Sequence, residues 1–169
     1  MNTYFYEYRG TKAQEQFLRI FLMQHADTLR LTNNIFSEIG FFYVRRHGSS
    51  NDHLLHNTLA MLRPYFSKKV IDNTRYNNIP QGKKSKFQHY FFHLSISLKK
   101  MVNRETLFWN NAPPGLSKVF YTLEDPVFYR QGKIIGWVIS HENCVCLNLS
   151  EAEYTKMKKK VPQMKQIQS

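Results

Sequence analysis

The N-terminal residues have the hydrophobic pattern of a β-strand followed by a helix. From residue 3 to residue 9, tyrosines fall on every second position, which is the period of a strand with one buried face. Thr11-Lys12-Ala13-Gln14 then has the spacing of a capping box, in which the Thr11 and Gln14 side chains satisfy free backbone amides at a helix start. The sequence therefore predicts a strand over 3–9 and a helix that begins at Thr11.

The middle of the chain shows apolar residues at helical spacing. A first helix is expected to run on to Ile39, with Asn33-Asn34 as the point at which it can break. A second is expected from Asn51 or Asp52 to Leu62, ended by Pro64. Further helical segments are expected over 65–76 and 87–102. These patterns predict a helical middle.

The last third changes to short β-branched or aromatic runs. Strands are expected over 118–123, 127–130, 133–140 and 144–149, with hairpin turns at 131–132 and 141–143. A second capping box, formed by Ser150 and Glu153, predicts a terminal helix that leads into lysines. The expected fold class is α+β: an N-terminal strand, a helical middle, and a C-terminal antiparallel meander that the first strand can join, then a terminal helix. We expect a single compact domain over 1–155 and a basic tail over 156–169.

Positive charge is concentrated in one segment of the chain. The net charge is +12 over 169 residues. Residues 63–104 hold ten Lys or Arg residues and one acidic residue, Asp72, a net charge of +9. Residues 105–155 hold three basic and six acidic residues, a net charge of −3. Such a basic block favours a polyanion as partner, because binding to phosphates releases condensed counterions.

Three lysines of this block lie where a helix alone would disfavour them. Lys83, Lys84 and Lys86 precede the helix expected over 87–102, and positive charge at a helix N-terminus costs roughly 0.3–1 kcal/mol per charge. Their position indicates a bound anion. Tyr65, Phe66 and Tyr76 are candidates either for stacking on bases or for the core. The predicted nucleic-acid-binding residues are Arg63, Lys68, Lys69, Arg75, Lys83, Lys84, Lys86, His89 and Tyr76.

No catalytic or metal-binding residues are expected. His89 and His93 are four residues apart, as in some zinc helices, but no Glu lies between them and no third ligand is marked. Cys144 and Cys146 are two thiols where structural zinc needs four ligands, so we expect them to be buried and reduced. A nuclease metal would need clustered carboxylates, and the Glu124-Asp125 pair is expected in a turn. We therefore expect no cofactor. A metal-independent ribonuclease using His, Lys and Tyr side chains is one alternative, because RNA carries its own 2′-hydroxyl nucleophile.

The start of the chain resembles a known family. The strand from Tyr4 to Arg9 and the helix start Thr11-Lys12-Ala13-Gln14-Glu15-Gln16 resemble the N-terminal part of transposon-encoded RNA-guided nucleases of the TnpB type. In that family a similar helix start is followed by a helical recognition lobe and a return to strands, an order that this chain resembles over most of its length. The family's nuclease domain and four-cysteine zinc ribbon have no counterpart here. The resemblance implies a part that binds guide RNA and DNA without the part that cuts.

Together these observations predict a small, basic nucleic-acid-binding protein from a mobile element or phage that acts without catalysis. RNA or single strands are favoured over duplex DNA, because no helix-turn-helix or zinc module is evident. A larger nucleoprotein complex is a further candidate partner, and an adaptor that binds an acidic protein partner is the second alternative. We expect a cytoplasmic protein with no membrane partner, because the apolar run 41–44 is far shorter than the roughly 20 residues that span a bilayer.

Overall fold

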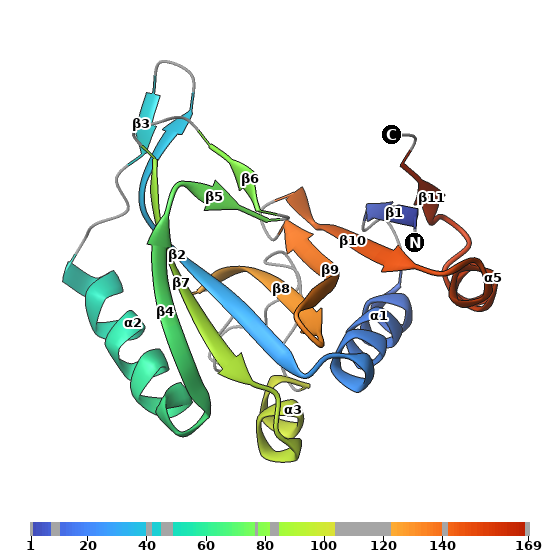
Figure 1. Ribbon diagram of the computed structural model, residues 1–169, viewed down its shortest axis with the longest axis horizontal. Coiled ribbons are helices and arrows are strands. Elements are labelled where there is room, and N and C mark those ends of the chain that lie inside the picture. Colours follow the sequence, from blue (N-terminus) through green and yellow to red (C-terminus); the bar gives the residue numbers. More distant parts are fainter. Residues whose placement is uncertain are drawn as a thin grey trace.

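The protein has an α+β fold, as the sequence predicts. The computed structural model describes residues 2–7, 11–39, 42–44, 49–76, 78–81, 85–103, 123–139 and 142–167, with the backbone alone for 34–39, 42–44 and 49–54. Among these residues a twisted antiparallel sheet of nine strands is accompanied by four α-helices (Figure 1).

The elements alternate along the chain, and strands far apart in the sequence become neighbours. The main sheet has the order β11-β1-β10-β9-β8-β2-β7-β4, with β3 paired to β2, while β5 and β6 form a separate hairpin. The strands are β1 (Asn2–Glu7), β2 (Thr28–Ile39), β3 (Phe42–Val44), β4 (Phe66–Asp72), β5 (Thr74–Arg75), β6 (Ile79–Pro80), β7 (Lys86–His93), β8 (Glu124–Arg130), β9 (Lys133–Ile139), β10 (Cys144–Leu149) and β11 (Lys165–Gln166). The helices are α1 (Lys12–His25), α2 (Ser49–Leu62), the 3₁₀-helix η1 (Arg63–Tyr65), α3 (Ile96–Val102) and α5 (Glu151–Lys160).

The two ends of the chain follow the sequence-based expectation closely. Thr11 caps α1 through a capping box with Gln14, and Ser150 caps α5 in the same way with Glu153. Strands β8, β9 and β10 form the expected meander, and β1 joins it by pairing antiparallel with β10. These predictions are confirmed. The strand expected over 118–123 lies almost entirely outside the described residues.

The helical middle was predicted wrongly in three places. Residues 28–39, 66–72 and 86–93 are the strands β2, β4 and β7. Within the helix predicted over 87–102, only the part from Ile96 onward is helical. The physical reason is tertiary, because β2 is hydrogen-bonded on both sides, to β7 and to β8. Such pairing over long sequence separation overrides the helical spacing of the larger apolar residues.

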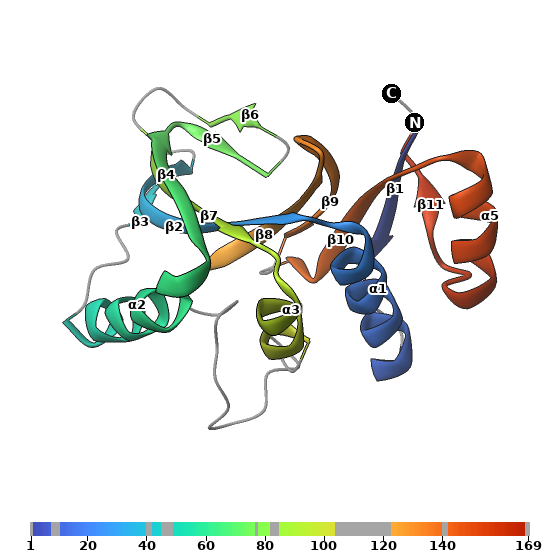
Figure 2. The same cartoon turned by 60° about the horizontal axis from the view of Figure 1, so that its bottom comes forward.

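Helices α1, α2 and α3 lie on one side of the sheet and the β5–β6 hairpin lies on the other (Figure 2). Leu29 and Leu31 of β2 join Leu18 of α1 and Leu98 of α3 in the main hydrophobic cluster. Successive side chains of a strand point to opposite faces, so Arg30 points away from these helices. We call this second side of the sheet the open face. A smaller cluster of Val127, Trp137 and Cys146 lies on it.

The C-terminal residues belong to the packed structure rather than to a tail. Met157, Val161 and Met164 are at most 2% exposed and lie in the main hydrophobic cluster. Strand β11 pairs with β1, and the backbone amide of Ile167 donates to the carbonyl of Thr3. The expectation of a basic tail over 156–169 is therefore corrected. Lys156, Lys159 and Lys160 are exposed on α5, whereas Met157 of the same helix is buried.

Candidate nucleic-acid interface

Four of the predicted contact residues are exposed cations along one edge of the sheet. Arg63 begins η1, Lys68 and Lys69 lie in β4, and Lys86 begins β7. Strand β4 pairs antiparallel with β7, so Arg63 lies beyond one end of β4 and Lys86 lies next to the other end. Within the described residues, none of the four has a carboxylate oxygen within 4.0 Å. We call these four residues the basic edge.

The two central lysines of the basic edge point to opposite faces of the sheet. The Lys68 ammonium lies 4.8 Å from the centre of the Phe91 ring, on the open face, whereas the Lys69 ammonium lies 5.5 Å from the centre of the Tyr90 ring. Each lysine therefore places its ammonium over an aromatic ring, and both residues remain exposed to water. A flexible polyanion can approach this edge from either face.

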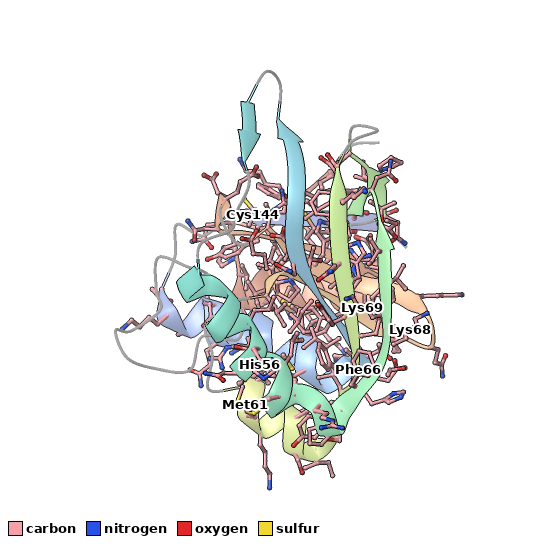
Figure 3. All side chains as sticks on the ribbon, turned by 90° about the vertical axis from the view of Figure 1, so that its left-hand side faces the viewer. His56, Met61, Phe66, Lys68, Lys69 and Cys144 are labelled. Atoms are coloured by element: carbon pink, nitrogen blue, oxygen red, sulfur yellow. The ribbon has the colours of Figure 1, made fainter. Side chains whose placement is uncertain are left out.

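Apolar side chains are exposed between these cations. Phe66 and Ile71 of β4 are 46% and 55% exposed, and Met61 of α2 is 38% exposed. Figure 3 shows Phe66, Lys68 and Lys69 along β4, with Met61 on the adjacent helix. Phe66 is thus accessible for stacking, whereas Tyr65 is half-buried against the main cluster. Within the described residues, β4 has no strand on its outer side.

Arg75 does not belong to the basic edge, contrary to the sequence-based expectation. It is 8% exposed, and its Nη2 lies 2.7 Å from an oxygen of Asp125 and 3.3 Å from one of Glu124. Burial lowers the pKa of Arg75, but Asp125, Tyr76 and Glu124 together outweigh burial and raise it overall. The guanidinium is therefore committed to an internal ion pair. Glu124 and Asp125, which we expected in a turn, are buried at the start of β8.

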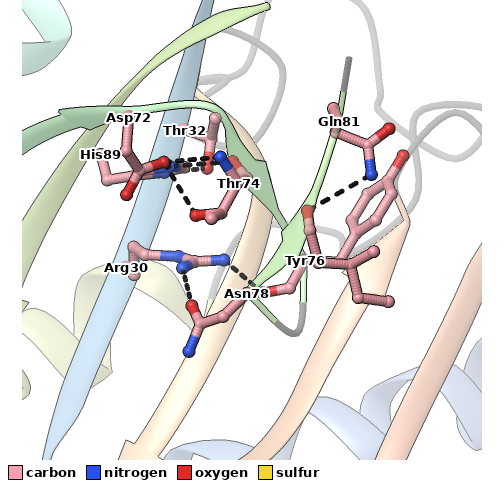
Figure 4. Close-up of polar contacts among 9 residues, drawn as sticks. Arg30, Thr32, Asp72, Thr74, Tyr76, Asn78, Gln81 and His89 are labelled. Carbon is pink, nitrogen blue, oxygen red and sulfur yellow. Dashed lines mark hydrogen bonds and ion pairs between the residues drawn. The ribbon is translucent and has the colours of Figure 1, made fainter. Parts of the chain in front are cut away.

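His89 is also buried, so it cannot meet a phosphate in this structure. It is 1% exposed. Its Nδ1 lies 3.0 Å from the Thr32 hydroxyl, and its Nε2 lies 3.1 Å from both Asp72 Oδ1 and the Thr74 carbonyl oxygen (Figure 4). The carboxylate and carbonyl only accept hydrogen bonds, so Nε2 donates and the Thr32 hydroxyl donates to Nδ1. Burial, and then the nearby Arg30, lower the pKa of His89, which keeps the ring neutral.

The Thr32–His89–Asp72 chain has the order of a nucleophile, a base and an orienting carboxylate. Thr32 and His89 are both 1% exposed, however, so a substrate has no access to the hydroxyl or to the ring that would have to accept its proton. Burial raises the pKa of Asp72, but hydrogen bonds from Thr74 and the contact with His89 lower it overall. The arrangement ties β2, β7 and the end of β4 together, and the geometry assigns it a structural role.

Arg30 is a buried cation that sequence reasoning missed. It is 2% exposed, and burial lowers its pKa. Its Nη1 donates to Asn78 Oδ1 at 2.8 Å and its Nη2 donates to the Tyr76 carbonyl, while its Nε has no partner among the described residues (Figure 4). The contacts hold the turn of the β5–β6 hairpin over the open face. On the helix expected over 11–39 nothing distinguished Arg30 from Arg19, the other arginine of that segment.

Tyr76 lies in that turn and is half-buried rather than free to stack. Its φ is 45°, and that of Asn78 is 57°, both in the left-handed region that costs a non-glycine residue of order 1 kcal/mol. The Tyr76 ring packs against the Val127–Trp137–Cys146 cluster, and the Arg75 guanidinium lies 4.8 Å from its centre. The ring therefore closes the hairpin onto the sheet. Lys83 and Lys84, the first lysines of the predicted anion site, lie outside the described residues.

The described residues hold no group of three or more His, Cys, Asp or Glu side chains that could bind a metal ion. Cys144 and Cys146 are buried and free. Burial raises the pKa of the Cys144 thiol to about 11 and that of Cys146 to about 12, so both stay protonated. No helix in the described part of the chain is both long enough and apolar enough to span a membrane.

Comparison with known proteins does not add to this geometry. No family model matches the sequence, and neither the curated proteins nor the solved structures contain a match to the chain. Function is therefore inferred from the residues described above.

Proposed function

We propose that the protein binds nucleic acid, with RNA or single strands favoured over duplex DNA, and that it binds through the basic edge. The observation that supports this most directly is the exposure of Arg63, Lys68, Lys69 and Lys86 without a carboxylate partner among the described residues. Surface cations bind phosphates by releasing counterions, and the arrangement of these four along one edge of the sheet suits an extended sugar–phosphate backbone.

Protection of a free edge is a competing explanation for part of this surface. Lysines in an edge strand discourage pairing with other chains, which accounts for Lys68 and Lys69. It does not account for Arg63, which precedes the strand, or for Lys86, which lies on the neighbouring strand β7. The four together extend along the whole length of β4, which favours a ligand-binding role.

An acidic protein partner is a second candidate. The unpaired edge of β4 carries exposed apolar and basic residues, with Phe66 and Ile71 on either side of the two lysines. An extended acidic segment could add to this edge as a further strand. A second copy of the chain fits less well, because antiparallel pairing of two β4 strands would bring Lys68 and Lys69 of both copies together.

The remaining alternatives gain less support. His89, one of the two histidines on which the ribonuclease alternative rests, is buried and has hydrogen-bond partners at both ring nitrogens, whereas the other, His93, is exposed. An origin in a mobile element or phage, and a place in a larger nucleoprotein complex, are implied by the resemblance to TnpB-type nucleases and remain proposals.

The test replaces the basic edge by neutral residues of similar length. The variant Arg63→Gln/Lys68→Gln/Lys69→Gln/Lys86→Gln should bind a labelled single-stranded RNA more weakly than the wild type, as measured by fluorescence anisotropy. For each phosphate that the variant no longer neutralises, the slope of log affinity against log salt should become less negative by about 0.7. Melting temperature should change little, because the four side chains are exposed.

The matched control removes the same charge elsewhere. Lys12, Lys133, Lys159 and Lys160 are exposed and lie away from β4, so their replacement by Gln lowers the net charge equally. An equal loss of affinity and slope in both variants would show that net charge, and not the basic edge, causes binding. Failure of the wild type to bind any nucleic acid, with retained binding to an acidic peptide, would favour the protein-partner candidate.

A further inference from the structure

Three side chains form a line across the open face of the sheet. Lys68 of β4 is paired in register with Phe91 of β7, and its ammonium lies 4.8 Å from the centre of the Phe91 ring. The Phe91 ring centre lies 6.0 Å from that of Tyr129 of β8, with the two rings inclined at 45°. We call Lys68, Phe91 and Tyr129 the aromatic stripe.

The two rings meet across β2, which lies between β7 and β8. Phe91 is paired with Arg30 of β2 and Tyr129 is paired with Thr28, so the two rings lie on adjacent cross-strand rows of the open face, diagonal to each other. The longer side chain of Arg30, the next β2 residue on this face, is held by Asn78 and Tyr76 of the hairpin. Because the Arg30 side chain is held by the hairpin, the Phe91 and Tyr129 rings approach each other across β2, with their centres 6.0 Å apart.

Packing of the core does not account for the position of Phe91. Phe91 is partly exposed, and it belongs to neither hydrophobic cluster of the described residues. Tyr129 lies at the rim of the smaller cluster and is also partly exposed. By contrast, Phe92 and Phe128, the neighbours of Phe91 and Tyr129 in the chain, point to the helices. They are at most 1% exposed and belong to the main hydrophobic cluster.

We propose that the aromatic stripe stacks the unpaired bases of a single-stranded nucleic acid, with Lys68 bound to a backbone phosphate beside them. This proposal rests on the proposed function and adds a second part of the surface to it. Every base has a flat π-face, so partly exposed rings on a sheet bind bases with little dependence on sequence. In a duplex these faces are covered by neighbouring bases, so the stripe distinguishes single strands from duplexes.

The basic edge and the aromatic stripe share Lys68, which makes one continuous path. The sugar–phosphate backbone of the nucleic acid follows the basic edge along β4. At Lys68 the bases of the nucleic acid turn from this edge across β7 towards β8. His93 is exposed on the same strand face as Phe91, two residues further along β7, and lies beside this path. A path of this length accommodates about two stacked bases, one on each ring.

The first experiment uses the wild-type protein and two probes with equal charge. Fluorescence anisotropy would compare a labelled oligouridine of about 12 nucleotides with the same oligomer carrying abasic residues at its central positions. The abasic probe keeps every phosphate but offers no base to stack. We expect it to bind about tenfold more weakly or worse. Equal affinity for the two probes would overturn the stacking proposal, whatever the variants do.

The second experiment locates the stacking. The variant Phe91→Leu/Tyr129→Leu should bind the base-bearing probe about as weakly as the wild type binds the abasic one, and should no longer discriminate between the probes. The variant Phe91→Tyr/Tyr129→Phe keeps both rings and should keep the discrimination. The matched control Phe21→Leu removes a partly buried ring from α1, on the helical side of the sheet, and should also keep it. If the Phe91→Leu/Tyr129→Leu variant still binds the base-bearing probe more tightly than the abasic probe, the bases stack on another part of the protein.

Failure of this proposal is distinguishable from failure of the proposed function. If the wild type binds oligouridine and its abasic analogue equally, with a salt slope that the basic-edge variant flattens, the protein binds nucleic acid by its phosphates alone and the aromatic stripe is not a stacking site. If the wild type binds neither probe, both proposals fail. Circular dichroism and melting temperature identify a variant that has not folded, and the wild-type comparison and the ring-retaining variant then still decide the question.

Discussion

Arg30 and Arg75 lie inside the protein, whereas Lys68 and Lys69 extend into solvent, although all four are cations on β-strands. The difference follows from the chemistry of the side chains. A guanidinium has five donors in a fixed plane, which suits internal partners such as the carboxylate of Asp125 or the carbonyl of Tyr76. An ammonium on a flexible chain remains hydrated. At this scale Arg30 and Arg75 hold the structure together, whereas the charges of Lys68 and Lys69 are accessible from solvent.

The internal ion pair of Arg75 gives a stability prediction. The change Arg75→Met should lower the free energy of unfolding by about 3–5 kcal/mol, because it leaves the fully buried Asp125 carboxylate without its guanidinium partner. Urea unfolding at neutral pH would measure this. The control Arg63→Met changes an exposed residue and should alter the free energy by no more than about 0.5 kcal/mol. Similar small effects for both would mean that the ion pair contributes little.

The buried imidazole of His89 predicts a pH dependence of stability. Its pKa is lowered in the folded state, so below about pH 6.5 the unfolded chain binds a proton that the folded chain does not. The free energy of unfolding should therefore decrease as pH falls from about 7 to about 5. Asp72, whose pKa is also lowered, loses its contribution only below about pH 4, outside this range.

Unfolding in urea over this pH series would compare the wild type with His89→Gln and His93→Gln. The first change should flatten the pH dependence, whereas the second removes an exposed histidine of the same strand and should leave it intact. Parallel curves for the wild type and His89→Gln would show that another group titrates.

At the scale of elements, local sequence signals predicted the structure correctly, whereas the pairing of strands far apart in the chain could not be predicted. Both capping boxes were predicted correctly, because each is a contact between side chains and backbone three residues apart. Strand β7 was predicted as a helix, because an aromatic run buried on both faces satisfies helical and strand spacing equally. Pairing with β2, some 60 residues earlier in the chain, determines that these residues form a strand. No local pattern carries that information.

The C-terminal segment, which we expected to be a tail, allows a matched comparison of two apolar residues. Met164 is fully buried, whereas Ile167, three residues later, is 43% exposed. The change Met164→Ala should lower the free energy of unfolding by about 2–5 kcal/mol, because it removes buried methylene groups and leaves a cavity. The change Ile167→Ala should cost less than about 1 kcal/mol. Thermal and urea unfolding would measure both, and equal costs would contradict the packing of this segment.

At the scale of the molecule, the sheet separates a helical face that supplies the core from an open face that carries the buried Arg30, the ion pair of His89 with Asp72, and the partly exposed rings of Phe91 and Tyr129. The α+β class and the meander followed from the sequence, because turns and alternating strands are local. The candidate site followed only in part. Exposure of Lys68 and burial of Arg75 depend on which strand lies at the edge and on the contact of Arg75 with Asp125, 50 residues away. The distribution of charge along the sequence located the basic segment, but it could not predict which of its cations are exposed and which are buried.

Strand β1 lies between β10 and β11, so the first described residues of the chain are paired only with some of the last. During translation, at roughly 5–20 residues per second, synthesis takes roughly 7–27 seconds to proceed from the end of β1 to the start of β10. Tyr4 and Tyr6, which are fully buried in the finished sheet, have no partner strand during that interval. Closure of the sheet at β1 must therefore be a late step of biosynthesis, and the nascent chain depends on chaperones or on its own solubility until then.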